Sequence, residues 1–393
     1  MKLLVCHNYY KKTSGEDLVI ASDLEILRKN GIECVEYSRS NSETDGYSLM
    51  QKISFFMNTI YNFKTVRGIE LLIEKEKPDV ALVQNVFPLI SPSVYHALHR
   101  LQIPIVQLVY NYRFICPNAI LYTNGKICER CVGGNYAHAI NNKCYRNSFM
   151  LSSVYAASIA IHRHLGKLSS LISAYVTPDL FLKNKLGKGK FPMERMFSVL
   201  NPFDVEKYTP DYSHKNYFVY FGRLVREKGI FTLLKVMKEI PAIKLVVVGG
   251  GEAEIEAWNF ARNNNLQNVE FTGPKYGDEL IAILSNATAI VVPTEWYDNS
   301  PLVVHQSFAL GKPVIASNID GIPEIIEHNR DGLLFSPGNV SELKEKIIFL
   351  QNNEDIRLQL GKNARAKAET LFTKEKRFEN LMRIIKFALQ NPI

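Results

Sequence analysis

Apolar and polar positions along the chain follow two periods, one typical of buried strands and the other of amphipathic helices. Short apolar runs bounded by turn residues predict strands, and longer segments between them repeat apolar residues at helical spacing. Strands are expected at residues 1–6, 32–37, 80–84, 105–110, 217–222, 244–249, 269–271, 289–293 and 313–316. Helices are expected at residues 17–29, 229–239, 302–310, 342–350, 355–371 and 375–389. This alternation predicts an α/β protein with parallel sheets covered by helices.

The length of the chain and a polar segment near its middle predict two domains. At 393 residues the chain exceeds the usual size of one domain. Asn201-Pro202 and residues 211–216 have the polar, proline-containing character of a linker. We therefore expect βα domains at residues 1–200 and 201–374, followed by a helical segment at 375–393.

Composition excludes several classes of protein. Hydrophobic residues make up 46% of the chain and charged residues 22%, which excludes a disordered or collagen-like protein. No apolar run is long enough for a membrane-spanning helix. The first residues read as a strand rather than a signal peptide, and six cysteines are too few for a disulfide scaffold, so we expect a cytoplasmic protein.

Positive charge is concentrated in the first half of the chain. Residues 1–200 hold 24 basic and 15 acidic side chains, whereas residues 201–393 hold 23 and 24. Such asymmetry suggests that the first half meets an anionic surface. No nucleic-acid recognition motif accompanies the charge, which favours a membrane or an anionic acceptor over a nucleic acid.

Residues 49–68 interleave aromatic and apolar side chains with Lys52, Lys64 and Arg67. Two interpretations stay open for this segment. It lies in a membrane interface with its basic side chains toward lipid phosphates, or it is a core helix with a solvated edge. The apolar stretch at residues 149–161 favours membrane contact, on the cytoplasmic face of the plasma membrane.

The loop and helix after the expected strand 289–293 have the features of a phosphate site. Pro301 is expected at the first helical position, where its fixed backbone angle suits a helix start. A helix that begins at the carboxyl end of a parallel strand offers free N–H groups to a phosphate. Asp298 precedes this helix and Gln306 lies within it. The alternative is an ordinary βα unit with a polar loop.

A second basic loop follows the strand at 217–222. Arg223 supplies several N–H donors in one plane, and Lys228 supplies a compact ammonium charge. Both lie at the same strand end, as the binding of a diphosphate requires. The alternative is a pair of basic side chains on the surface. The glycines at 249–251 lack the spacing of a dinucleotide fingerprint and are weak evidence.

Four cysteines form a further cluster, in which a C-x2-C pair is flanked by two more: Cys116, Cys128, Cys131 and Cys144. A structural zinc site, reduced core thiols and disulfides all stay open for this cluster. Three histidines have no partner at a diagnostic spacing and are interpreted as ordinary residues: His7, His162 and His164.

Several motifs, in this order, resemble the large family 4 of retaining glycosyltransferases: GRLVREKG, VVGGGE, FTGP, PTEWYDNSPLVVHQSFALGKPVIAS and GIPEII with GLLFSPG. The resemblance extends over nearly the whole chain, because the loop at residues 14–17 and the stretch NYRFICPN also match. It implies the GT-B fold, in which two Rossmann-like domains face each other across a donor cleft. It also implies that the helix at 375–389 returns to the N-terminal domain.

The resemblance implies roles for individual residues. Arg223 and Lys228 would hold the diphosphate of a nucleotide sugar, and Asp298 would contact the donor sugar, as the catalytic residues. Donor contacts are further implied for Gly15, Glu16, Tyr110, Asn111, Gly222, Gly250, Thr272, Gly273, Pro274, Asn299, Ser300, Pro301, Leu302, Val303 and Gln306. The sequence departs from the family pattern where Asp298 and Gln306 replace two glutamates and where Tyr110 replaces a histidine.

The implied activity is transfer of a sugar, with retention, from a nucleoside-diphosphate sugar to a hydroxyl of a lipid-linked saccharide or cell-surface polysaccharide precursor. No carboxylate nucleophile is evident, which favours front-face attack assisted by the leaving diphosphate. We expect no catalytic metal and no cofactor beyond the donor, apart from the zinc considered above. Two alternatives stay open: a nucleotide-sugar epimerase, and a sugar-nucleotide-binding protein with impaired catalysis.

Overall fold

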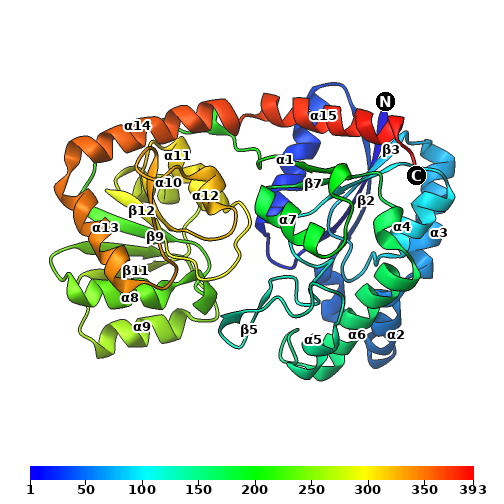
Figure 1. Cartoon of the computed structure of the whole chain (residues 1–393), viewed down its shortest axis with the longest axis horizontal. Coiled ribbons are helices and arrows are strands. Elements are labelled where there is room, and N and C mark those ends of the chain that lie inside the picture. Colours follow the sequence, from blue (N-terminus) through cyan, green and yellow to red (C-terminus); the bar gives the residue numbers. More distant parts are fainter. The chain divides into compact units, whose positions relative to one another are not determined.

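The computed structural model divides the chain into two compact units, each built on its own parallel sheet (Figure 1). It describes the backbone of residues 1–393 and every side chain except those of Leu49, Lys52 and Ile53. The first unit comprises Met1–Pro202 with Lys374–Ile393, and the second comprises Phe203–Thr373. The expected α/β class is confirmed in both units.

The first unit contains a six-stranded parallel sheet in the order β2-β1-β3-β4-β7-β8. Its strands are β1 (Lys2–Tyr9), β2 (Glu33–Ser40), β3 (Val80–Val83), β4 (Ile105–Leu108), β7 (Ala174–Thr177) and β8 (Met196–Ser198). A small antiparallel hairpin is formed by β5 (Tyr122–Thr123) and β6 (Lys126–Ile127). The helices are α1 (Gly15–Lys29), α2 (Leu49–Ile60), α3 (Phe63–Glu76), α4 (Ser93–Arg100), α5 (Ala137–Asn141), α6 (Phe149–Ala160), α7 (Leu180–Lys188) and α15 (Lys374–Gln390).

Helices α1 and α15 pack side by side and cover the core of this sheet (Figure 1). Apolar residues of α15 lie in one cluster with β1 and α1, and the fully buried ones are Leu381, Ile384, Ile385 and Ala388. Leu389, an apolar position of the expected helix, is 37% exposed, because the helix buries a stripe that ends at Ala388. The last residues of the chain are therefore part of the core of the first unit.

The second unit contains a six-stranded parallel sheet in the order β11-β10-β9-β12-β13-β14. Its strands are β9 (Tyr217–Phe221), β10 (Lys244–Val248), β11 (Val269–Gly273), β12 (Ala289–Val292), β13 (Val314–Ser317) and β14 (Gly332–Phe335). Its helices are α8 (Ile230–Glu239), α9 (Glu254–Asn263), α10 (Gly277–Ser285), α11 (Leu302–Ala309), α12 (Ile322–Ile325), α13 (Val340–Asn352) and α14 (Glu354–Leu371). Strand order reverses between β9 and β12, which places the loops after these two strands at a topological switch point.

The sequence explains where several elements begin and end. Ser14 caps α1 through a capping box with Asp17, and Gly31 takes a positive φ of 76° just after the helix ends. Pro301 was expected at the first helical position of α11. The structure places it one position earlier, as the N-cap, with an extended ψ of 120°, so this expectation was wrong by one residue.

Candidate functional site

Loops after β9, β10 and β11 pack backbone against backbone at the carboxyl edge of the second sheet. Gly249 has a φ of 140°, and a β-carbon there would lie 1.9 Å from the carbonyl oxygen of Gly222. A β-carbon at Gly250 would lie 3.3 Å from the Pro274 ring. Three residues that are expected to contact the sugar donor, Gly222, Gly250 and Pro274, thus lie at one edge of the sheet. Position 249 requires a glycine, because two loops touch there.

Lys228 and Asp298 form an ion pair at the same edge. The two side chains are only 18% and 12% exposed, and the Lys228 ammonium lies 5.9 Å from the centroid of the Trp296 ring. Lys228 follows β9 and Asp298 follows β12, which are neighbours in the sheet. The order of the strands therefore brings together two residues that lie 70 positions apart in the sequence.

Arg223 lies in the same loop after β9 as Lys228, and its side chain is exposed. The Tyr220 hydroxyl donates a hydrogen bond of 2.8 Å to the Arg223 carbonyl. Burial, and then the Asp298 carboxylate, raise the pKa of Tyr220, while the Arg223 guanidinium lowers it. Both charges thus act on one hydroxyl. We call Arg223, Lys228, Trp296 and Asp298 the Lys228 cluster.

The other residues of the second unit that are expected to contact the sugar donor lie in the loops and in the helix α11 around this cluster. Asn299 and Ser300 precede α11, whereas Leu302, Val303 and Gln306 lie in α11 and are partly exposed. The Thr272 hydroxyl donates to the carbonyls of Val247 and Gly273, at 3.3 and 3.1 Å. Its hydroxyl is therefore engaged by the backbone, and Gly273 takes a positive φ of 70° beside it.

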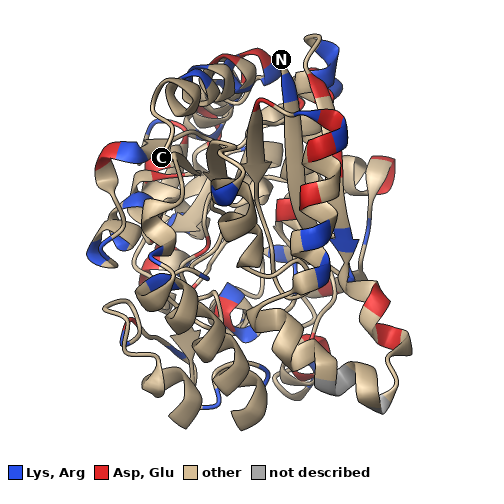
Figure 2. Ribbon diagram, turned by 90° about the vertical axis from the view of Figure 1, so that its right-hand side faces the viewer, with Lys and Arg blue, Asp and Glu red and all other residues tan. Residues whose placement is uncertain are grey.

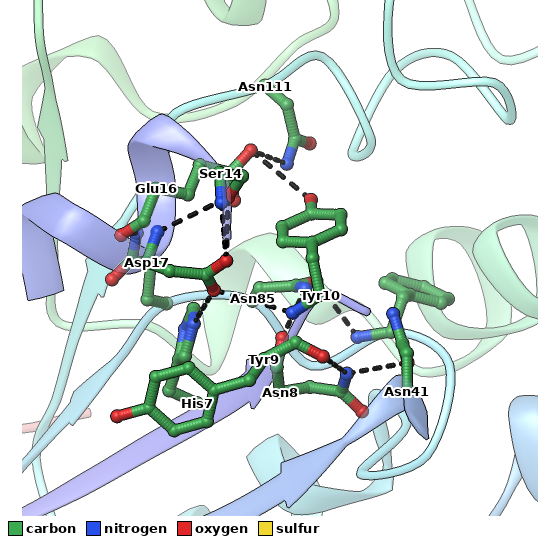
Figure 3. Close-up of polar contacts among 12 residues, drawn as sticks. His7, Asn8, Tyr9, Tyr10, Ser14, Glu16, Asp17, Asn41, Asn85 and Asn111 are labelled. Atoms are coloured by element: carbon green, nitrogen blue, oxygen red, sulfur yellow. Dashed lines mark hydrogen bonds and ion pairs between the residues drawn. The ribbon is translucent and has the colours of Figure 1, made fainter. Parts of the chain in front are cut away.

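A second polar cluster lies where β1 ends and α1 begins in the first unit (Figure 3). His7 Nε2 lies 2.8 Å from Asp17 Oδ1, and both side chains are buried. Ser14 donates to Asp17 from its backbone N–H and its hydroxyl. Burial alone would raise the pKa of Asp17, but the hydrogen bonds from His7 and Ser14 outweigh it and lower that pKa.

This His7–Asp17 contact was missed by the sequence analysis, which interpreted His7 as an ordinary histidine. The available signal was the capping box of Ser14 and Asp17, which turns the Asp17 carboxylate back toward the end of β1. The pair fixes the start of α1 against the strand.

Glu16 faces a different set of partners from Asp17 (Figure 3). Asn111 Nδ2 donates to Glu16 Oε1 at 2.9 Å, and the Tyr10 hydroxyl donates to the same atom at 3.3 Å. Burial raises the pKa of Glu16, and the hydrogen bond from Asn111 is the largest opposing effect. We call Tyr10, Glu16 and Asn111 the Glu16 cluster, which joins the α1 start to the segment after β4.

A cavity of the first unit opens beside the Glu16 cluster. Its polar lining comes from the start of α1 and from the ends of β3 and β4, and includes Glu16, Gln84, Asn85, Gln107, Tyr110, Asn111 and Arg113. Asn85 Nδ2 donates to the Asn8 carbonyl at 2.7 Å, which ties the loops after β1 and β3 together (Figure 3). The cavity therefore lies at the carboxyl edge of the sheet, where parallel sheets usually bind ligands.

Tyr110 lines this cavity, but its hydroxyl is engaged by the C-terminal helix. Arg377 Nη2 donates to the Tyr110 hydroxyl at 2.6 Å. Burial raises the pKa of Tyr110, and Arg377 opposes it. Tyr110, which stands where the family pattern has a histidine, thus contacts α15 as well as the cavity.

The four cysteines are all free thiols with other partners. Cys116 Sγ donates to Asn118 Oδ1 at 2.8 Å, and Arg130 Nε donates to Cys128 Sγ at 3.2 Å. Burial, and then the nearby thiols of Cys116, Cys128 and Cys144, raise the pKa of Cys131 to about 12. Among the described side chains, no group of three or more metal-binding residues is arranged to hold an ion. The structure thus describes four free thiols near one another, without a disulfide between them.

The segment at 49–68 forms α2 and the first turn of α3. Helix α2 packs against α6. Figure 2 shows few charged residues on these helices, and by sequence α2 carries one, Lys52, while α6 carries none. Large apolar side chains nevertheless remain exposed on α2, α3 and α6, including Met57 at 68%, Phe63 at 76% and Phe149 at 60%. The Lys52 side chain lies outside the described residues.

Within the described part of the chain, no helix has the length and apolar character needed to cross a bilayer.

Comparison with known proteins defines the class of the fold. The structure of HepE from Anabaena in complex with UDP superposes with a TM-score of 0.69 at 15% identity, covering 98% of this chain and 100% of HepE. The fold is therefore of the GT-B type.

Residues 205–367 match the family described as Glycosyl transferases group 1. An uncharacterized glycosyltransferase of Methanocaldococcus jannaschii is 33% identical over 150 residues, covering 38% of this chain and 42% of that protein. The capsular polysaccharide biosynthesis glycosyltransferase CapM of Staphylococcus aureus is 28% identical over 223 residues, covering 54% and 58%. The chain thus spans about half the length of these two relatives.

Proposed function

We propose that the protein is a retaining glycosyltransferase. It would transfer a sugar from a nucleoside-diphosphate sugar to a hydroxyl of a lipid-linked saccharide or of a cell-surface polysaccharide precursor. The observation that carries the proposal is the contact between Lys228 and Asp298 beside Arg223, at the switch point of the second sheet. This arrangement offers two cations and one carboxylate acceptor at the place where α/β proteins bind nucleotides.

The Lys228 cluster has the charges that a diphosphate leaving group needs. When the bond between the sugar and the diphosphate breaks, negative charge grows on the departing phosphate oxygen. Arg223 and Lys228 stabilise that charge, and the amino end of α11 adds its partial positive charge. In front-face attack, the acceptor oxygen bonds to the anomeric carbon and its proton passes to the departing phosphate. No protein nucleophile is needed.

Asp298 and Gln306 determine how the rest of the donor is held. Asp298 accepts hydrogen bonds from sugar hydroxyls, and the Gln306 amide donates to or accepts from the ribose. Because Asp298 pairs with Lys228, the donor diphosphate competes with a carboxylate for the ammonium. The HepE complex contains UDP, which makes uridine diphosphate the first nucleotide to test.

Surface features of the first unit support an acceptor that is attached to a lipid. Exposed apolar side chains of α2, α3 and α6 lie in the half of the chain that carries the excess of basic residues. Such a surface binds the headgroup region of an anionic bilayer reversibly. The protein would then be cytoplasmic and attached to the inner face of the plasma membrane. The name of CapM, which refers to capsular polysaccharide, favours the same class of acceptor.

The test is donor turnover with a panel of labelled nucleotide sugars, with and without lipid extracts as acceptors. The proposal predicts that label enters the lipid fraction and that the diphosphate is released only when acceptor is present. Turnover without acceptor would indicate an epimerase or a hydrolase instead. Tight donor binding without turnover in any extract would indicate a sugar-nucleotide-binding protein.

A further inference from the structure

A second polar cavity lies in the second unit, at the amino edge of its sheet and away from the Lys228 cluster. His214, Thr288 and Lys312 each precede a strand by one to three positions, namely β9, β12 and β13. These strands are neighbours and run parallel, so their amino ends share one edge. All three residues line a cavity of about 420 Å³, part of it open to solvent, together with the first turn of α14.

The cavity gathers buried cationic groups. Lys312 is 2% exposed and Arg357 is 7% exposed. Lys312 Nζ donates to the Ser213 carbonyl at 2.6 Å, and Arg357 donates to the Leu350 carbonyl at 2.9 Å. A second guanidinium nitrogen of Arg357 lies 2.6 Å from His214 Nε2. The side chains that project toward one another here are thus two cations and an imidazole.

Negative charge near these groups is sparse. Glu354 is the only described carboxylate within 4 Å of Arg357, at 3.8 Å, and its side chain is 82% exposed. Asp211 accepts hydrogen bonds from Ser213, and no described carboxylate lies within ion-pair distance of Lys312. Burial lowers the pKa of Lys312 to about 8 and also lowers the pKa values of His214 and Arg357. Buried charge without a counterion is costly, and a bound anion would remove that cost.

Helix α14 adds a further attraction for an anion. It has 18 residues, and its N-cap, Asn353, makes no side-chain capping bond. The first N–H groups of such a helix point outward with a partial positive charge, of which two acidic residues of the first turn, Glu354 and Asp355, offset a part. Glu354 and Arg357 both line the cavity, which shows that this first turn borders it.

We propose that this cavity binds a phosphate group, either orthophosphate or a phosphomonoester. Cationic donors reach it from two separate elements, Lys312 before β13 and Arg357 on α14, and His214 before β9 accepts from Arg357 and helps to position it. The oxygens of a tetrahedral phosphate dianion point in several directions and can accept from donors on different elements. A planar carboxylate, in contrast, is bound by the paired N–H groups of a single arginine. Arginine supplies the paired donors and lysine the point charge. The inference does not rest on the proposed transferase activity.

The experiment is calorimetric titration of the full chain at pH 7 and constant ionic strength, with orthophosphate and with a hexose 6-phosphate. Lys312→Met is expected to weaken binding about tenfold or more, since it removes a charge-assisted donor. Lys215→Met is the matched control, because Lys215 lies next to His214 in the loop before β9 but is exposed and does not line the cavity. Tighter binding of the hexose phosphate than of orthophosphate identifies a phosphomonoester as the ligand, and equal binding identifies free phosphate.

Lys228→Met separates this cavity from the diphosphate-binding residues. If Lys228→Met abolishes saturable phosphate binding and Lys312→Met does not, the phosphate binds elsewhere and the proposal is wrong. Absence of saturable binding to the wild-type protein would also overturn it, and Lys312 would then serve only to fasten the loop at Ser213. Arg357→Gln provides a second variant in case Lys312→Met does not fold.

Proton linkage gives an independent readout with sulfate, which does not titrate between pH 7 and 9.5. A bound anion favours the charged form of Lys312, so affinity should fall as pH rises through about 8. The charged and titratable groups that face Lys312 are Asp211, Tyr212 and His214 from the loop before β9, and Glu354 and Arg357 from α14. Lys312→Met should abolish this pH dependence, and an unchanged profile in that variant would contradict the site.

Discussion

Arg377 and Asp23 form a fully buried ion pair with two hydrogen bonds, of 2.8 and 2.7 Å, which joins α15 to α1. The same guanidinium donates to the Tyr110 hydroxyl, in the segment that lines the cavity of the first unit. A residue near the end of the chain therefore supports both the core and the binding surface of the first unit.

Breaking this pair should destabilise the first unit strongly. Asp23→Ala leaves the Arg377 charge buried without a partner, at a cost of about 3–5 kcal/mol. The loss should be measured by hydrogen exchange of peptides from α1 and β4, because both tryptophans lie in the second unit and do not report on the first.

The matched control is Lys374→Ala, which removes a surface ion pair between the same two helices, Lys374 with Glu25. Such pairs contribute about 0.2–1 kcal/mol. Equal effects of the two variants would contradict the importance of the buried pair.

Arg223→Ala and Lys228→Ala should each reduce sugar transfer about ten- to a hundredfold with the fold intact. Each removes a charge-assisted hydrogen bond to the diphosphate, worth about 1.5–3 kcal/mol. Steady-state transfer rates and circular dichroism provide the measurements. Arg226→Ala is the control, since Arg226 lies in the same loop but is exposed and paired with Glu256. Unchanged donor binding and rate in the first two variants would remove the diphosphate assignment.

Asp298→Asn should have opposite effects on nucleotide binding and on catalysis. The substitution frees the Lys228 ammonium, so the affinity for uridine diphosphate should rise, by up to about fivefold for an ion pair worth roughly 1 kcal/mol. Transfer should fall, because asparagine accepts hydrogen bonds from sugar hydroxyls less strongly than a carboxylate. Titration calorimetry and kinetics test the two parts separately. A parallel loss of both would mean that Asp298 supports the nucleotide rather than competing with it.

Two adjacent carboxylates of the first unit should respond to pH with opposite signs. Burial raises the pKa of Glu16 above its unfolded value, so its ionised form destabilises the fold at neutral pH and the penalty disappears as pH falls through that raised pKa. Glu16→Gln should therefore be more stable than wild type at pH 7, and the gain should vanish in acid.

Asp17 has a lowered pKa, so its ionised form stabilises the fold above its unfolded pKa, and this contribution is lost as pH falls through the folded pKa. Asp17→Asn should lose stability at pH 7, with a difference that shrinks in acid. Urea denaturation of the two variants across this pH range checks both signs. Effects of the same sign would contradict the pKa assignments.

Membrane contact should depend on the basic and apolar side chains of residues 49–68. Neutralising Lys52, Lys64 and Arg67 together should weaken sedimentation with anionic vesicles, by about 1 kcal/mol for each charge, and leave donor binding unchanged. Substituting Met57 and Phe63 by serine should weaken it further at high salt, where charge is screened. Neutralising Lys75 and Lys77, at the other end of α3, is the control. Absence of wild-type binding at low salt would favour a soluble acceptor.

The fold was largely predictable because its central strands are buried on both faces. Residues 80–83 and 289–292 are wholly apolar and fully buried, so their sequence pattern alone identifies them. Strands β7, β8 and β14 were not predicted. β8 has only three residues, and both β8 and β14 lie at the edges of their sheets.

Contacts between distant residues were not predicted from the sequence. Lys228 and Asp298 follow two expected strands, and the family resemblance implied that both touch the sugar donor, but their ion pair was not expected. Asp23 and Arg377 are 354 positions apart and show no local pattern, since each reads as a polar residue on an amphipathic helix. Which residue pairs with a buried charge depends on how the helices pack in three dimensions. A single sequence does not show that packing.

The position of α15 has a consequence for synthesis on the ribosome. The first unit is translated first, but part of its core, from Leu381 to Ala388, is made last. The whole second unit, residues 203–373, is translated in between, which at about 5–20 residues per second takes roughly 10–35 s. During that interval the nascent first unit exposes the apolar surface that α15 later covers and lacks the counterion of Asp23. The second unit, which needs no later segment, is thus the first to complete its fold, and the N-terminal half depends on protection from aggregation until α15 has been made.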